Sequence, residues 1–140
     1  MPHVMIIEAR FYEDIADELV RGASQVLDAR GVKHDRVDVP GTFEIPAAIM
    51  WNLSVYDGFI ALGCVIRGET THYDYVCGES ARGLQDLALQ HRAPIGYGIL
   101  TVENKEQAWE RASVDKRNKG KDAAEACLRM IELKYQAEAK

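Results

Sequence analysis

The segment Gly63 to Val76 (GCVIRGETTHYDYV) contains the residue types best suited to chemistry in this chain. An apolar run, Phe59 to Ile66, ends there in a turn rich in glycine and hydroxyl groups, and a helical pattern begins at Tyr73. Such a turn presents free backbone N–H groups and the positive end of a helix dipole, which suit an anion. His72 lies beside it, and an imidazole can exchange protons near neutral pH. The segment predicts phosphate binding and proton transfer, although a surface histidine at a helix start would look the same.

The spacing of Gly63 and Gly68, followed by Glu69 and Thr70, nearly copies a nucleotide-binding P-loop. The motif needs a lysine where this chain has Glu69, and a carboxylate there would repel a triphosphate. We therefore expect a single phosphate, held by helix N–H groups and threonine hydroxyls.

Three cysteines, Cys64, Cys77 and Cys127, are widely spaced in apolar surroundings, which is typical of reduced core cysteines. Cys64 lies within a strand-like run and has no activating partner defined by the sequence, so nucleophilic catalysis by it is disfavoured. His72, Asp74 and Cys77 match no recognised metal-ligand spacing. We expect neither a disulfide framework nor a metal site.

The chain has 140 residues and a formal net charge of −5, and its basic residues are scattered. This length fits one domain with its own core, and the charge argues against a nucleic-acid surface. No charged and apolar leader is visible, and no apolar run approaches the length of a membrane span. We expect a cytoplasmic protein whose partners are small molecules or copies of itself.

Strand-like and helix-like patterns alternate along the chain. The predicted strands are Val4 to Ala9, Lys33 to Val39, Phe59 to Ile66, and Ile95 to Val102. The predicted helices are Ile15 to Val26, Thr42 to Leu53 with Pro46 in its first turn, Tyr73 to about Arg92, Asn104 to Ala112 opened by a capping box with Gln107, and Asp122 to Tyr135. A charged turn is expected at Asp115 to Lys121, and a frayed tail at Ala137 to Lys140.

This alternation predicts an α/β protein: a three-layer α/β/α sandwich, flavodoxin-like, with a four-stranded parallel sheet ordered 2-1-3-4. Ligands of such sheets bind beyond the carboxyl ends of the strands. Three unusual turns would meet at that edge, namely Arg10 to Tyr12, Gly41 to Glu44, and Arg67 to His72. Their convergence favours an enzyme or small-ligand site over a purely structural role.

Structural explanations compete at several of these positions. Phe11 would serve as a hydrophobic staple or as a platform for a planar ligand, and Phe43 would serve as a core residue or a pocket wall. Glu44 suits either a helix dipole or a ligand N–H group. Arg111 lies late on its helix, where a cation suits the dipole, and position alone favours that role.

Four ordered blocks together resemble the lumazine synthase family, and the resemblance runs from Val4 to about Leu133. The blocks are Val39 to Pro46 (VPGTFEIP), Gly63 to Val76, Gly98 to Asn104 (GILTVEN), and Asn118 to Gly120 (NKG). The family has the α/β/α sandwich already inferred from the pattern. The resemblance implies condensation of 5-amino-6-(D-ribitylamino)uracil with 3,4-dihydroxy-2-butanone 4-phosphate to 6,7-dimethyl-8-ribityllumazine, without a cofactor.

The resemblance also implies a role for each matching residue, with His72 as the proton carrier. Arg111 would complete the phosphate site, against the structural role that its position favoured. The pyrimidine and ribityl chain would contact Phe11, Thr42, Phe43, Glu44, Cys64, Val65, Ile66, Lys119 and, from a neighbouring subunit, Tyr97; the phosphate would contact Glu69, Thr70 and Arg111.

Family sites lie between adjacent subunits of a homopentamer, and some members build larger shells from pentamers. Only ten residues precede Phe11, and Ala112 to Arg117 replaces the turn of shell-forming members. We therefore expect an isolated pentamer or a loose pair of pentamers, and a functional link to riboflavin synthase through the pathway. The competing interpretation is a paralogue that binds lumazine or flavin with little turnover.

Overall fold

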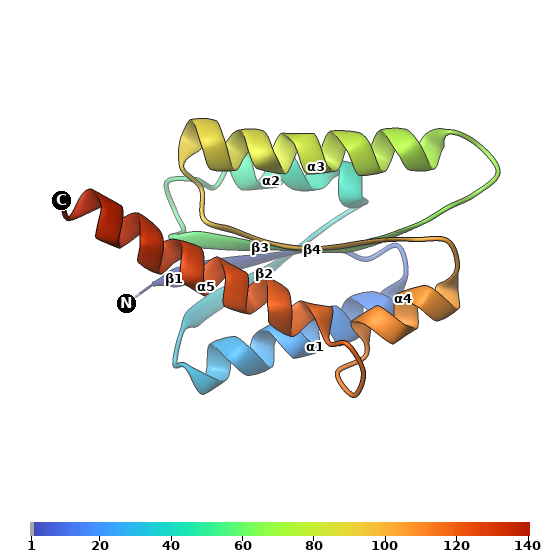
Figure 1. Cartoon of the computed structure of the whole chain (residues 1–140), viewed down its shortest axis with the longest axis horizontal. Coiled ribbons are helices and arrows are strands. Elements are labelled where there is room, and N and C mark those ends of the chain that lie inside the picture. Colours follow the sequence, from blue (N-terminus) through green and yellow to red (C-terminus); the bar gives the residue numbers. More distant parts are fainter. Residues whose placement is uncertain (1) are drawn as a thin grey trace.

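Four parallel strands form the middle layer of the molecule in a computed structural model that describes residues 2–140 (Figure 1). They are β1 (His3–Ala9), β2 (Lys33–Val39), β3 (Gly58–Ile66) and β4 (Ile95–Val102). The strand order is β2-β1-β3-β4, and every pairing is parallel. The predicted order and strand positions are confirmed, to within one residue at the strand ends.

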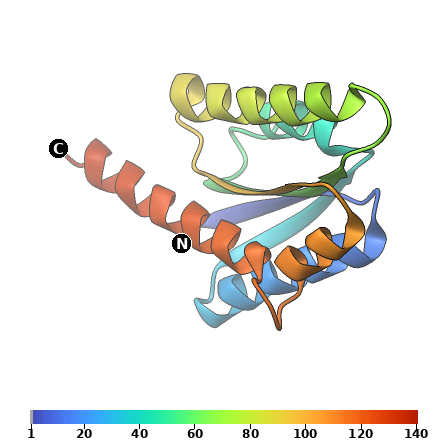
Figure 2. The ribbon, with the colours of Figure 1, turned by 45° about the vertical axis from the view of Figure 1, so that its right-hand side comes forward.

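Helices cover both faces of this sheet (Figures 1 and 2). On one face lie α2 (Ile45–Met50), which follows a single 3₁₀ turn, η1 (Thr42–Glu44), and α3 (His72–His91). On the other lie α1 (Glu13–Ala29), α4 (Lys105–Ala112) and α5 (Lys119–Glu138). The three-layer sandwich is therefore confirmed. The helices that directly follow a strand in the chain, α1 to α4, all begin at the carboxyl edge of the sheet, at the right of Figure 1.

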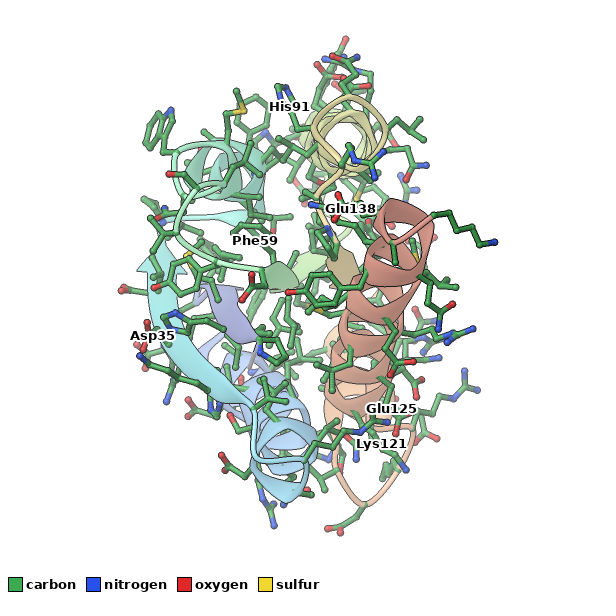
Figure 3. The ribbon with its side chains drawn as sticks, turned by 90° about the vertical axis from the view of Figure 1, so that its left-hand side faces the viewer. Asp35, Phe59, His91, Lys121, Glu125 and Glu138 are labelled. Atoms are coloured by element: carbon green, nitrogen blue, oxygen red, sulfur yellow. The ribbon has the colours of Figure 1, made fainter. Side chains whose placement is uncertain are left out.

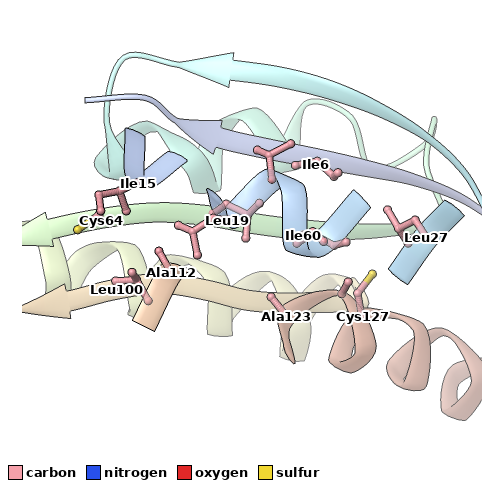
Figure 4. Close-up of a cluster of buried hydrophobic side chains, with 14 of the residues drawn as sticks. Ile6, Ile15, Leu19, Leu27, Ile60, Cys64, Leu100, Ala112, Ala123 and Cys127 are labelled. Carbon is pink, nitrogen blue, oxygen red and sulfur yellow. The ribbon is translucent and has the colours of Figure 1, made fainter. Parts of the chain in front are cut away.

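The core has two halves because successive strand side chains point to opposite faces of the sheet. Ile6 and Ile60 pack beneath Leu19 of α1 in the half shown in Figure 4, together with Cys127 of α5. The other half holds Met5, Ile7 and Phe59 against Ile45 and Ile49 of α2. Each fully buried Leu, Ile or Phe contributes about 1.5–3 kcal/mol, so the sheet is fixed from both sides.

Helix α4 begins as its sequence predicts. The Asn104 side chain accepts a hydrogen bond from the Gln107 N–H at 2.8 Å. The Gln107 side chain reaches back to the N–H of Glu103, also at 2.8 Å, rather than to that of Asn104 as in a standard capping box. The cap thus fixes the turn after β4 as well as the helix start.

Several helix boundaries differ from expectation. Helix α1 extends the predicted Ile15 to Val26 at both ends, to Glu13–Ala29. The helix predicted over Thr42 to Leu53 opens as the η1 turn and ends at Met50, although Pro46 does lie in the first turn of α2. Helix α5 begins at Lys119, inside the predicted charged turn, because Asn118 adopts φ 48° and its side chain accepts a hydrogen bond from the Lys121 N–H.

The predicted frayed tail, Ala137 to Lys140, is wrong over its first half, since α5 continues to Glu138. An ion pair of 3.3 Å between Arg92 and Glu138 ties this last turn to the end of α3. Within residues 2–140 no helix combines the length and the apolar composition that a bilayer crossing requires.

Candidate active site

A cavity of about 510 Å³ lies at the carboxyl edge of the sheet, where the turns after β1, β2 and β3 meet. This is the edge at which ligands of parallel sheets bind. Eleven residues line it: Phe11, Tyr12, Gly41, Thr42, Phe43, Glu44, Cys64, Val65, Ile66, His72 and Val76. The structure therefore gathers eight predicted site residues around one space, and adds Tyr12, Gly41 and Val76 to them.

Two aromatic side chains form the mouth of the cavity. Phe11 is 75% exposed and Phe43 is 55% exposed, which is unusual for phenylalanine. The Phe11 and Tyr12 rings form a T-shaped pair, with centroids 4.9 Å apart and ring planes at 76°. Such exposure excludes a hydrophobic staple for Phe11 and a core role for Phe43. The exposed ring of Phe11 therefore suits contact with a planar ligand.

The turn after β2 is seated closely on β3. Thr42 is 6% exposed, and its hydroxyl packs closely against Gly63. A Cβ atom added at position 63 would lie only 2.8 Å from Thr42 Oγ1. Gly63 therefore permits the close approach that places Phe43 and Glu44 at the cavity. Glu44 precedes α2 without making a side-chain capping hydrogen bond. Glu44 is exposed and lines the cavity.

The start of α3 supplies the imidazole and free backbone N–H groups that suit an anion. His72 is the first residue of the helix, and its backbone N–H donates to Thr70 Oγ1 at 3.3 Å. The side chains of Glu69, Thr70 and His72 are all exposed, and only His72 lines the cavity. A phosphate at the helix start would meet N–H groups and a hydroxyl next to the imidazole.

Arg67 holds this turn in place, a role that the sequence pattern did not reveal. Its backbone N–H donates to the Val102 carbonyl at 2.9 Å, and its Nε donates to Glu103 at 2.7 Å. The guanidinium also lies 4.2 Å from the centroid of the Tyr73 ring. Glu103 belongs to the turn after β4, 36 residues away, so only the paired strands bring the two together.

Five predicted site residues do not line the cavity: Glu69 and Thr70, which precede His72 in the turn before α3, and three residues on other elements. Tyr97 projects from edge strand β4 and is 46% exposed. Lys119 pairs with Asp122 at 3.3 Å at the start of α5. Arg111 lines a separate open hollow along α4 and donates to the Gln107 carbonyl at 3.1 Å, as expected of a cation near a helix C-terminus. A single chain therefore does not bring these three to the Phe11 and His72 cavity.

Cys64, the cysteine that lines the cavity, is unreactive as a nucleophile. Burial raises the pKa of the Cys64 thiol to about 12, with a smaller contribution from the Asp14 carboxylate. A thiol in that state is almost wholly protonated at neutral pH, and the thiolate is the nucleophile. Cys64 therefore serves as an apolar wall. Within residues 2–140, all three cysteines are free, and no three His, Cys, Asp or Glu side chains gather as a metal-ligand set.

A smaller cavity, of about 320 Å³, lies at the opposite edge of the sheet (Figure 3). It is lined in part by Phe59, His91 and Glu138, and the ion pair between Arg92 and Glu138 lies beside it. It contains none of the predicted site residues. The chemistry-bearing groups are concentrated at the carboxyl edge.

The fold and the cavity define a small-molecule-binding protein of the doubly wound α/β class, with exposed aromatic rings, a carboxylate and an imidazole around one pocket. Comparison with known proteins gives the family. The family model described as 6,7-dimethyl-8-ribityllumazine synthase matches residues 2–135. The chain belongs to this family.

Several relatives share more than half of their residues with the chain. Proteins named 6,7-dimethyl-8-ribityllumazine synthase from Bartonella tribocorum and Agrobacterium fabrum are 57% and 54% identical, over 95% of this chain and 90% and 95% of their own lengths. A protein from Rhizobium meliloti named 6,7-dimethyl-8-ribityllumazine synthase 1 is 55% identical over 94% of this chain and 91% of its own length.

Proposed function

We propose that this chain is a 6,7-dimethyl-8-ribityllumazine synthase, which condenses 5-amino-6-(D-ribitylamino)uracil with 3,4-dihydroxy-2-butanone 4-phosphate and releases phosphate and water. The observation that carries the proposal is the single cavity that joins Phe11, the Thr42–Glu44 turn and His72 in a chain of this family. An aromatic platform suits the pyrimidine ring, and the polar turn suits its N–H groups.

The residues around the cavity suit each step of the reaction. The pyrimidine amine attacks the ketone and forms an imine with loss of water; phosphate then leaves, and closure of the second ring releases another water. These steps move protons but need no strong nucleophile, so an imidazole at His72 is sufficient and the protonated Cys64 is not required. Orientation of two substrates in one cavity supplies the larger part of the acceleration, up to about 7–11 kcal/mol in well-oriented systems.

In this proposal the phosphate binds at the start of α3, at the N–H groups and hydroxyl of Glu69 and Thr70. A positive side chain is needed to balance its charge, and Arg111 of an adjacent subunit fills that role. Tyr97 and Lys119 likewise reach the ring from an adjacent subunit. The location of these three residues outside the cavity of their own chain supports a site shared between copies.

A shared site requires a closed ring of subunits, and we propose a homopentamer. A ring forms when a surface on one side of each copy fits a different surface on the other side. Edge strand β4 and a hollow bordered by Leu89, Met130 and Leu133, which are 38–72% exposed, offer such an unpartnered surface. Sedimentation should give the mass of five or ten copies of the 15.7 kDa chain, and a mass far above ten copies would contradict the proposal.

The enzymatic proposal is tested by mixing the purified protein with both substrates while lumazine fluorescence and phosphate release are followed. Arg111→Ala should form product with a raised KM for the butanone phosphate and a nearly unchanged KM for the pyrimidine. Arg129→Ala is the matched control, because Arg129 is exposed on α5 and its one ion pair within residues 2–140 is with Glu132, at 3.0 Å. It should behave as the unaltered protein does.

Equal release of lumazine and phosphate would establish the synthase. Tight binding of lumazine without product would refute the enzymatic proposal and favour the binding paralogue. An Arg111→Ala protein with an unchanged KM for the butanone phosphate would remove Arg111 from the phosphate site while leaving the synthase assignment intact.

A further inference from the structure

One carboxylate is buried near the cavity without belonging to it. Glu8 lies near the carboxyl end of β1, is 2% exposed, and faces the α1 layer. Arg36 of β2 donates two hydrogen bonds to this carboxylate, from Nε to Oε2 at 2.7 Å and from Nη2 to Oε1 at 2.9 Å. Arg10 donates to the same carboxylate from the turn after β1. A charge this deeply buried is retained only when partners satisfy it, as these two arginines do.

Arg10 reaches further than Glu8. Its second nitrogen donates to Asp17 of α1 at 2.6 Å, so one guanidinium spans the strand end and the first part of the helix. Between these anchors lies the short turn that carries Phe11. The Tyr12 carbonyl on the far side of this turn is held as well, because it accepts the Ala16 N–H at 2.9 Å.

Phe11 itself has little that would hold its side chain. The ring is 75% exposed and, among the described residues, forms an aromatic pair with Tyr12 alone, so packing does little to fix its direction. Its orientation must come from the backbone on either side. The backbone before Phe11 is fixed by the contacts of Arg10, and the backbone after it by the first turn of α1.

We propose that Arg10 is a positioning residue for the ring platform: clamped between Glu8 and Asp17, it fixes the turn that presents Phe11 to the pyrimidine. This inference rests on the proposed function, since it assigns the ring to Phe11. Arg10 lines no part of the cavity. It acts through Phe11.

Arg36 supplies a matched control within the same network. It binds the same buried carboxylate but belongs to β2 and has no link to the turn. If the network served only stability, losing either arginine would have the same consequence. If Arg10 positions the platform, only its loss should weaken ring binding.

The test measures binding of 6,7-dimethyl-8-ribityllumazine by fluorescence titration, together with KM for each substrate and resistance to unfolding. Arg10→Gln should raise the lumazine Kd and the pyrimidine KM by about tenfold, with the butanone phosphate KM unchanged. Arg36→Gln should unfold more easily yet bind lumazine normally. Asp17→Asn, at a partner that is 64% exposed, leaves Glu8 satisfied and should raise the lumazine Kd by about threefold even if Arg10→Gln does not fold.

A double-mutant cycle shows whether Arg10 acts through the platform. In a Phe11→Ala protein, Arg10→Gln or Asp17→Asn should have almost no further effect on the lumazine Kd. Undiminished effects in that background, or equal loss of ring binding in Arg36→Gln and Arg10→Gln, would overturn the inference. If the unaltered protein neither binds lumazine nor forms it, the proposed function fails, a result distinct from normal ring binding by the Arg10 and Asp17 variants.

Discussion

The close packing of Thr42 against Gly63 allows us to predict how much stability a substitution at position 63 would cost. In Gly63→Ala, the new Cβ would lie 2.8 Å from Thr42 Oγ1 and 3.3 Å from the Ala9 Cβ, both shorter than comfortable contact. Thr42 has a stiff, β-branched side chain and is 6% exposed, so it has little room to rotate away. The turn that begins with Thr42 must shift.

Two terms of opposite sign set the stability change. Crowding of a packed site costs about 1–3 kcal/mol, whereas replacing a strand glycine by alanine recovers about 0.5–1 kcal/mol of chain entropy. The net loss is about 1 kcal/mol, and the melting temperature should fall by roughly 3–5 °C at fixed protein concentration. Because the displaced turn carries Phe43 and Glu44, the KM for the pyrimidine should rise while the KM for the butanone phosphate changes little.

The assay combines thermal unfolding with steady-state kinetics in both substrates. Gly78→Ala is the control. Gly78 lies within α3, and among residues 2–140 no atom beyond its chain neighbours and the nearby helix backbone comes within 4 Å of the added Cβ, so the change should stabilise the protein by about 0.5–1 kcal/mol. Thr42→Ala should relieve the crowding, so its combination with Gly63→Ala should be more stable than the two single effects predict. An unchanged melting temperature and pyrimidine KM in Gly63→Ala would refute the reasoning.

Three further outcomes are expected. His72→Ala should slow turnover by roughly 10²- to 10⁴-fold while leaving measurable product, because orientation of the substrates persists; no detectable turnover, or an equal loss in His91→Ala at the far edge, would contradict this. Burial alone would raise the pKa of Glu8, but hydrogen bonds and charge from Arg36 and Arg10 outweigh it and hold that pKa below 4.5. Its ionised form therefore stabilises the fold above about pH 4.5, and this contribution disappears as the pH falls through the lower folded value; denaturant unfolding should show a smaller acid-induced loss in Glu8→Gln than in the unaltered protein. Cys64, with its pKa raised to about 12, should resist iodoacetamide at neutral pH until the protein is denatured, and Cys64→Ala should retain turnover; rapid labelling of the folded chain detected by mass spectrometry would argue for a reactive thiol.

The apolar periodicity along the chain was sufficient to predict the sheet. The continuous apolar run of β3 identified it as a central strand, because central parallel strands are buried on both faces. Right-handed crossovers then left few possible strand orders. Helix ends were harder to predict. The start of α5 depends on Asn118, which adopts φ 48°, and on Gly120. A Cβ atom at position 120 would lie 2.1 Å from the Leu19 carbonyl oxygen, so this close packing requires a glycine. Such packing against α1 has no signature in the local pattern.

The site shows the same division. The sequence by itself determined which residue types stand at the ends of β1, β2 and β3, and the parallel topology then required those ends to share an edge. The tertiary structure alone decided that Phe11 and Phe43 are exposed, that Gly63 admits Thr42, and that Arg10 clamps the turn before Phe11. The physical reason is range: periodicity and turn chemistry act over a few residues, whereas burial, close approach and ion pairing join segments that are distant in the chain and meet only when it folds.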